Sequence, residues 1–157
     1  MFEFTNKFDT IENDELILQV MQKYSGDDEM IPFYYYDIIR KADNVTVGKI
    51  SIRIGNNFHS NYNGHIGYEI FNKYRGNGYA YKASLLVLDV ARFHDMKFIY
   101  LTCDEGNVAS YRTIEKLGTE LVEICDAPRE YFGWHEGMEK QRIYKLDLDT
   151  YDVRKLT

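Results

Sequence analysis

The sequence is poor in cysteine and lacks any long apolar segment. Only Cys103 and Cys125 occur among 157 residues, at a spacing that matches neither a metal knuckle nor a redox pair. We interpret both as buried, inert thiols in a reducing compartment. No stretch approaches the length of a membrane span, and residues 1–10 carry charges where a secretory signal is apolar. These absences predict a cytoplasmic protein with no membrane partner.

Runs of lysine and arginine are also absent. Nucleic-acid binding needs clustered cations to neutralise phosphates, so the sequence argues against a nucleic-acid partner. No group of His, Cys, Asp or Glu has the spacing of metal ligands, and we expect no metal site. The formal net charge of -6 favours a cationic substrate such as an amine, although solubility accounts for the same charge.

The composition that remains is that of an ordinary globular chain. Hydrophobic residues make up 45% and aromatic residues 15% of the sequence, well above the content of disordered segments. A chain of this length builds one sizeable core, and no linker, internal repeat or low-complexity tract divides it. We therefore predict a single domain over residues 1–157.

The first half of the chain predicts one helix followed by three antiparallel strands. Apolar residues recur at helical spacing over residues 14–24, behind an Asn or Asp cap. Residues 33–40, 45–54 and 65–71 are rich in β-forming residues and are separated by polar turns. We expect them to form a meander, with a β-bulge near Gly48.

The second half alternates helices and strands. The helices are expected at residues 78–94 and 107–117, and the strands at residues 97–102, 120–125 and 141–148. The last two strands are expected to pair across the loop that joins them. This order of elements predicts a mixed α/β fold with an antiparallel beginning and a helix-bearing middle.

A glycine turn joins the third predicted strand of the meander to the long helix. Residues 68–80 read Tyr-Glu-Ile-Phe-Asn-Lys-Tyr-Arg-Gly-Asn-Gly-Tyr-Ala. Free N–H groups at a helix N-terminus attract anions, and Gly76 and Gly78 let a phosphate approach the main chain. Arg75 adds a forked positive charge. The turn matches neither a Walker loop nor a dinucleotide fingerprint, and a glycine pair alone also fits a simple helix-start turn.

Two motifs resemble those of the GNAT superfamily of N-acetyltransferases. Residues 75–80 resemble its Arg/Gln-x-x-Gly-x-Gly/Ala signature, and residues 67–71 resemble the fourth strand that precedes it. Residues 107–118, Asn-Val-Ala-Ser-Tyr-Arg-Thr-Ile-Glu-Lys-Leu-Gly, resemble its Asn-x-x-Ser helix ending in Glu-Lys-x-Gly, most closely in the ribosomal-protein (Rim-type) branch. The resemblance implies a central mixed, mostly antiparallel sheet, splayed between its fourth and fifth strands and flanked by helices on both faces.

The resemblance also implies acetyl-coenzyme A (acetyl-CoA) as acetyl donor and coenzyme A as product. Ile70 and Phe71 would offer backbone groups to the pantetheine arm and to the thioester carbonyl, where a main-chain amide acts as an oxyanion donor. Asn107 would bind the pantetheine arm, or serve only as a helix cap. The amides of the glycine turn would bind the pyrophosphate. They belong to Arg75, Gly76, Asn77, Gly78, Tyr79 and Ala80.

The proton donor of this family is missing from its usual place. Many members carry a tyrosine just before the Glu-Lys-x-Gly segment, and it protonates the departing thiolate. This sequence has Ile114 there, which cannot donate a proton. By resemblance to the ribosomal branch, Ser110 takes the role. The adjacent Tyr111 is the alternative, but it projects about 100° around the helix from Ser110.

The attacking amine must lose a proton, so a general base is expected as well. Glu69 on the fourth strand is the carboxylate nearest to the thioester along the chain. Strand alternation places it on the face opposite Tyr68 and Ile70. Three histidines are alternative bases, namely His59, His65 and His135.

The loop between the last two strands is expected to bind the acceptor. Tyr131, Trp134 and Glu136 would cage an ammonium group, although the same aromatic residues would also anchor the loop. The acceptor is expected to be a small-molecule amine or a protein N-terminus, and the family suggests a homodimer. Two other functions are alternatives. A non-catalytic acetyl-CoA-binding or regulatory domain is favoured by Ile114, and an ATP-binding protein would need magnesium ligands that we do not find.

Overall fold

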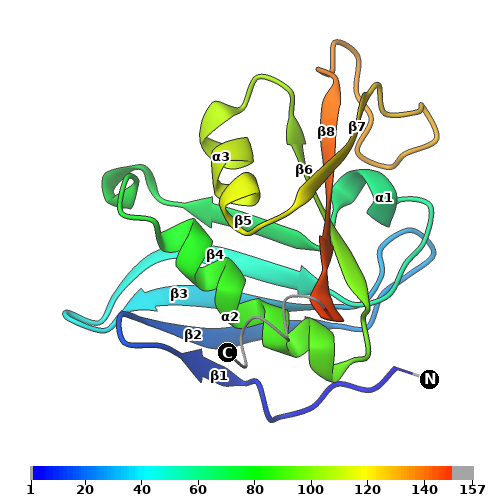
Figure 1. The fold of residues 1–157 in the computed structure, drawn as a ribbon. Coiled ribbons are helices and arrows are strands. Elements are labelled where there is room, and N and C mark those ends of the chain that lie inside the picture. The colour runs from blue at the N-terminus through cyan, green and yellow to red at the C-terminus, as the bar shows by residue number, and fades with distance from the viewer. Residues whose placement is uncertain (1, 150–157) are drawn as a thin grey trace.

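The computed structural model describes residues 2–149 as two antiparallel sheets and their helices (Figure 1). The ends of the predicted domain, residues 1 and 150–157, lie outside the described residues. The strands are β1 (Thr10–Glu12), β2 (Leu16–Tyr24), β3 (Phe33–Arg40), β4 (Val45–Arg53), β5 (Ile66–Ile70), β6 (Phe98–Asp104), β7 (Glu120–Cys125) and β8 (Gln141–Asp147). The helices are α1 (Ser60–Asn63), α2 (Tyr79–Phe93) and α3 (Val108–Lys116), and η1 (Asn72–Tyr74) is a 3-10 turn.

The predicted mixed α/β fold is confirmed. One sheet has the order β1-β2-β3-β4-β5 and the other β6-β8-β7, and all described pairings are antiparallel. The β3–β4 register shifts beside Gly48, where a bulge was expected. β7 and β8 pair across their long loop, as predicted. The opening between the fourth and fifth strands of the family pattern lies here between β5 and β6.

The helix predicted over residues 14–24 is wrong. The segment forms β2, which pairs with β3 from Leu16 opposite Arg40 to Tyr24 opposite Phe33. Leu16 and Leu18 are fully buried on one face, the period-2 pattern of a strand. At Met21 the β2–β3 register shifts, because β2 has one residue more than β3 at this point. The extra residue interrupts the alternation of apolar residues and makes their spacing look helical. Pairing on both sides overrides the local pattern.

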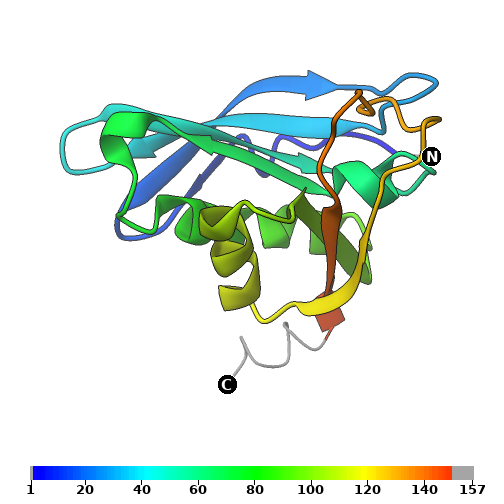
Figure 2. The same ribbon diagram turned by 90° about the horizontal axis from the view of Figure 1, so that it is seen from above.

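The helices cover the sheets on defined faces. α2 packs on the five-stranded sheet through fully buried Ala83, Val87 and Ala91, and Figure 2 shows α2 and α3 on the same side of that sheet. On the second sheet, the Thr102 hydroxyl of β6 donates a hydrogen bond to the Tyr62 carbonyl of α1. The next residue, Cys103, contacts Ser110 of α3. Successive strand residues point to opposite faces, so α1 and α3 flank β6 on both sides.

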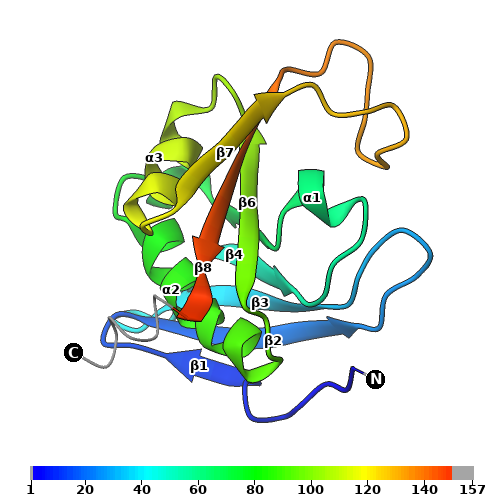
Figure 3. The ribbon, with the colours of Figure 1, turned by 45° about the vertical axis from the view of Figure 1, so that its right-hand side comes forward.

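The two sheets meet at one end through His65. Its N–H donates to the Tyr100 carbonyl at 2.7 Å, and the Tyr100 N–H donates back to His65 Nδ1 at 2.9 Å. From this vertex β5 and β6 diverge, and Figure 3 shows β6 leaving the strands of the first sheet. The sequence thus builds a wedge that is closed at His65 and opens toward Ile70.

Candidate active site

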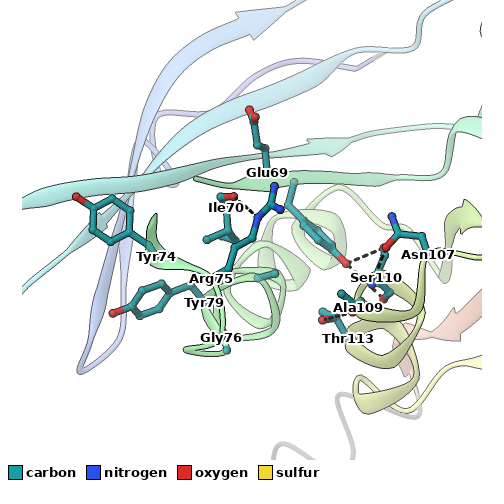
Figure 4. Close-up of a pocket in the computed structure, with 13 residues that line it drawn as sticks. Glu69, Ile70, Tyr74, Arg75, Gly76, Tyr79, Asn107, Ala109, Ser110 and Thr113 are labelled. Atoms are coloured by element: carbon teal, nitrogen blue, oxygen red, sulfur yellow. Dashed lines mark hydrogen bonds between the residues drawn. The ribbon is translucent and has the colours of Figure 1, made fainter. Parts of the chain in front are cut away.

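The open end of the wedge holds a pocket of about 470 Å³ (Figure 4). Its walls come from β5, from the turn that follows it, and from the starts of α2 and α3. Most of the residues predicted around a cofactor therefore meet in one place. The lining residues are Tyr68, Glu69, Ile70, Tyr74, Arg75, Gly76, Gly78, Tyr79, Ala80, Asn107, Ala109, Ser110 and Thr113.

The start of α2 has the features of an anion site. No side chain caps this helix, so the N–H groups of its first turn keep their hydrogen-bonding capacity and the positive end of the dipole. Gly76 and Gly78 have φ angles of 85° and 75°, which L side chains adopt only under strain. No atom outside the neighbouring residues lies within 4 Å of a Cβ built on Gly76. The turn is open enough for a phosphate.

Arg75 and Asn77 shape this turn with their side chains. Arg75 Nε donates to the Ile70 carbonyl at 3.0 Å and so holds the end of β5 against the turn. Asn77 Nδ2 donates to the Tyr74 carbonyl at 2.9 Å. Asn77 does not line the pocket, in contrast to Arg75. Its expected role near the pyrophosphate is therefore restricted to its main chain.

The main chain of β5 corrects the expectation for Phe71. The Phe71 N–H donates to the Val47 carbonyl at 2.9 Å and is not free to stabilise an oxyanion. Alternate residues of an antiparallel strand direct their backbone groups to opposite edges. Ile70 therefore turns its N–H and carbonyl toward the opening. Of the two predicted residues, the structure keeps Ile70 in the pocket and leaves Phe71 outside.

The start of α3 supplies side chains from the other wall. Asn107 is the N-cap of this helix, and its Oδ1 accepts from the Ser110 N–H at 3.2 Å. Its Nδ2 has no described partner and remains available to a ligand. Ser110 lines the pocket, whereas Tyr111 does not, because the Arg142 guanidinium stacks on the Tyr111 ring at 4.1 Å. Ile114 is buried in the core.

Tyr68, which is not among the predicted site residues, faces Ser110. The Tyr68 hydroxyl reaches across the opening from β5 to within 3.1 Å of Ser110 Oγ. Burial raises the pKa of Tyr68, and its hydrogen bonds to Ser110 and Thr113 act in the opposite direction. Alternation already places Tyr68 on the same face as Ile70, and this signal could have identified it.

Glu69 points away from this hydroxyl pair. Its side chain is exposed and leaves the opposite face of β5, as Figure 4 shows. Lys49 lies opposite it on β4 and is 3.7 Å from Asp37. The Glu69 carboxylate and the Ser110 hydroxyl therefore lie on opposite sides of β5.

The loop between β7 and β8 is anchored on α1 by aromatic packing. Tyr131 is buried, and its hydroxyl donates to Asn63 Oδ1 at 3.3 Å. This matches the anchoring alternative for Tyr131. The Arg129 guanidinium lies 4.8 Å from the Trp134 ring centroid and occupies a face that an ammonium group would need. Glu136 is exposed, and no described contact joins it to either ring.

The three histidines have different surroundings. His65 is fully buried, and its Nε2–H donates to the Gly55 carbonyl at 2.8 Å while Nδ1 accepts from Tyr100. Desolvation lowers its pKa from 6.5 to about 4. Both ring nitrogens are occupied, so His65 is not the general base. His59 accepts from the Phe132 N–H and stacks on that ring, and His135 is exposed.

The two cysteines differ in burial. Cys103 is buried, as predicted, but Cys125 is half-buried, which corrects the expectation for that thiol. Both are free thiols, and desolvation raises the pKa of each. Between residues 2 and 149, no cluster of His, Cys, Asp and Glu is arranged to hold a metal ion. In the same part of the chain, no helix has the length and apolar character needed to span a membrane.

Comparison with known families agrees with the geometry of the pocket. The model of the acetyltransferase (GNAT) domain matches residues 3–120. The chain belongs to the GNAT acetyltransferase family. It is therefore an acetyltransferase, and its acetyl donor is acetyl-CoA. No curated protein matches the sequence.

Solved structures show the same fold at low identity. A GNAT acetyltransferase from Bacillus anthracis is 22% identical over 73% of this chain and 66% of its own, with a TM-score of 0.57. A protein described as a ribosomal-protein-serine acetyltransferase from Vibrio cholerae is 17% identical over 92% and 99%, with a TM-score of 0.62. The spermidine/spermine N-acetyltransferase of Vibrio cholerae is 13% identical over 91% and 99%, with a TM-score of 0.66.

The pocket of this GNAT acetyltransferase fits the donor. Acetyl-CoA carries a pyrophosphate, a long polar arm and a thioester. The uncapped start of α2 suits the pyrophosphate. The β5 main chain at Ile70 and the Asn107 side-chain amide suit the polar arm. The hydroxyl groups of Tyr68 and Ser110 suit the thioester. This match rests on the residues that line the cavity.

Proposed function

We propose that this acetyltransferase transfers the acetyl group of acetyl-CoA to a primary amine, by direct attack of the amine nitrogen on the thioester carbonyl. The acceptor is a small-molecule amine or a protein N-terminus. The observation that carries the proposal is the pocket itself, which joins an uncapped helix N-terminus to the Ser110 hydroxyl across the opening between β5 and β6. An anion site next to a proton-donating hydroxyl suits a phosphate-bearing thioester.

Each wall of the pocket has a role in this proposal. The amides from Arg75 to Ala80 bind the pyrophosphate, and the Ile70 main chain and Asn107 Nδ2 bind the pantetheine arm. Ser110 protonates the leaving thiolate, and Glu69 accepts the proton of the amine from the opposite face of β5, directly or through water. Glu69 is exposed to solvent, which lets a cationic acceptor reach it.

The acceptor side and the surroundings of the enzyme are also proposals. The formal charge of -6 favours a cationic amine, and the spermidine/spermine enzyme in the comparison acts on such compounds by its name. The β7–β8 loop, with Trp134 and Glu136, borders this side in the proposal. We also propose a homodimer, supported by the exposed apolar residues Leu121 and Val122 on the edge strand β7, and a cytoplasmic location, supported by the scarcity of cysteine. Sedimentation and cell fractionation test these two points.

Isothermal titration with acetyl-CoA, with ATP and NAD as controls, tests the pocket. We expect saturable binding of acetyl-CoA alone. Ala80→Glu is expected to weaken that binding at least about tenfold, because a carboxylate at the helix start repels the pyrophosphate. The same carboxylate favours the helix dipole, so lost binding does not reflect unfolding. Ala80→Gln is the uncharged control of equal size.

The outcomes separate binding from catalysis. Binding of ATP or NAD in place of acetyl-CoA would contradict the proposed site. Ser110→Ala and Glu69→Gln are expected to keep acetyl-CoA binding and to lower turnover in an amine panel of polyamines, amino sugars and short peptides. Unchanged turnover in both variants would overturn the catalytic roles. Binding without turnover by the wild type on any amine would favour a regulatory domain.

A further inference from the structure

The contact between Tyr68 and Ser110 joins the two walls of the opening. Tyr68 belongs to β5 and Ser110 to α3, 42 positions later in the chain. Their hydroxyl oxygens lie 3.1 Å apart, and the tyrosine also lies 3.5 Å from the Ser110 carbonyl. Both residues line the cavity (Figure 4). The pair is therefore open to a ligand on one side and held by the protein on the other.

Ser110 alone is a weak source of protons. Loss of its proton leaves an alkoxide, which is far more basic than a phenolate, because a phenol has a pKa near 10. Ile114 carries no proton to give, and Tyr111 does not line the pocket, its ring lying against the Arg142 guanidinium. Of the side chains that line the pocket near Ser110, Tyr68 is the most acidic neutral donor. Burial raises its pKa, so it is protonated at neutral pH.

We propose that Tyr68 is a positioning residue that orients the Ser110 hydroxyl toward the leaving sulfur and replaces the proton that Ser110 gives up. The inference deepens the proposed function and rests on it. The strand residue Tyr68 thereby takes over the task that a tyrosine at the position of Ile114 would perform from the helix.

The proposed step conserves atoms and charge. The amine nitrogen forms a bond to the carbonyl carbon, and the carbon–sulfur bond breaks with its electron pair going to sulfur. The thiolate takes the proton of Ser110 Oγ, and Ser110 Oγ takes the proton of the Tyr68 hydroxyl. The amine loses one proton to Glu69 or to water, and the Tyr68 phenolate regains one from water. The products are the amide and the thiol of coenzyme A.

The first test varies the leaving group. Tyr68→Phe keeps the ring in place and removes only the hydroxyl. With acetyl-CoA and the best amine from the panel, we expect kcat to fall about 10- to 100-fold and KM for acetyl-CoA to stay within about twofold. With an analogue that carries selenium in place of the thioester sulfur, the defect should vanish, because a selenolate leaves without a proton. A purely structural role would give the same defect with both donors.

Tyr111→Phe is the matched control, because it removes a tyrosine hydroxyl from the neighbouring residue on α3. The Arg142 contact with its ring survives the substitution, and we expect wild-type kcat with both donors. The double variant Tyr68→Phe/Ser110→Ala should be no slower than Ser110→Ala alone, since both hydroxyls serve one step. Multiplicative losses in the double variant would contradict the relay.

The second test needs no turnover. Calorimetry compares coenzyme A with its desulfo analogue, which lacks the sulfur that the hydroxyl pair contacts. The wild type should bind coenzyme A severalfold more tightly than the analogue, and Tyr68→Phe and Ser110→Ala should both lose this preference. A wild type that binds neither compound would overturn the proposed function itself. A preference that Tyr68→Phe retains in full would overturn the relay and leave the function intact.

Discussion

His65 is the residue that fixes the geometry of the wedge. It is fully buried at the vertex, and its ring and backbone together make three hydrogen bonds to main-chain groups of Gly55 and Tyr100. Regular main-chain pairing between β5 and β6 would join the two sheets into one at this point. The imidazole instead takes the place of the backbone groups between β5 and β6, so the strands separate beyond it.

The protonation state of His65 predicts how stability depends on pH. Desolvation lowers its pKa from 6.5 to about 4 in the folded protein. At pH values between these two pKa values, His65 binds more protons in the unfolded chain than in the folded chain. Its contribution to stability is therefore fully present above pH 6.5 and is lost as the pH falls toward the folded pKa. We expect the free energy of unfolding to fall by about 2 kcal/mol between pH 7.5 and pH 5. Urea denaturation across this range measures it.

Two variants check the assignment to His65. His65→Asn removes the titrating ring and should flatten most of this pH dependence, at a lower stability overall. A smaller dependence of the same sign should remain, because desolvation also lowers the pKa of His94. His135→Gln changes an exposed ring and should leave the wild-type slope. Equal slopes in the wild type and His65→Asn would show that other groups are responsible.

At the scale of elements, the sequence correctly predicts the helices and strands that local residue patterns determine. α2 and α3 begin and end within a residue or two of the expected limits, because each has a strong apolar period and a recognisable start or stop. β2 was predicted as a helix because a bulge hides its alternation, and only pairing with β1 and β3 decides between the two. The short helix α1 lies in a polar segment that gave no signal.

The features of the site also fall into those that a local motif predicts and those that depend on contacts between distant parts of the chain. The glycine turn and the cap of α3 depend on the main chain near one motif, so Gly76, Gly78 and Asn107 could be found from the sequence. The contact between Tyr68 and Ser110 depends on how far β5 and α3 lie apart across the opening. Strand alternation gives the face of Tyr68, but no local pattern gives that distance. The bond that ties up the Phe71 amide depends on register in the same manner.

At the scale of the whole molecule, the binding site joins two sheets that otherwise separate. The described main-chain hydrogen bond that joins the two sheets lies at the vertex, between the His65 N–H and the Tyr100 carbonyl, while the pocket at the open end takes its lining from β5, α2 and α3. A ligand held by all three walls closes the wedge from its open side. Its binding free energy therefore stabilises both parts of the fold against unfolding.

This arrangement predicts a large thermal stabilisation by acetyl-CoA. A ligand at 100 times its Kd adds about 2.7 kcal/mol to the folded state. For a chain of this size the unfolding midpoint should rise by roughly 5–10 °C. Scanning calorimetry should show one transition that moves as a unit, and hydrogen exchange should slow in β5 and in α3 together. Ala80→Glu should show a smaller shift under the same conditions, about half that of the wild type if its Kd is ten times higher. Slower exchange in β5 and α2 alone would mean that the donor binds one wall of the wedge and that α3, with Ser110, does not take part.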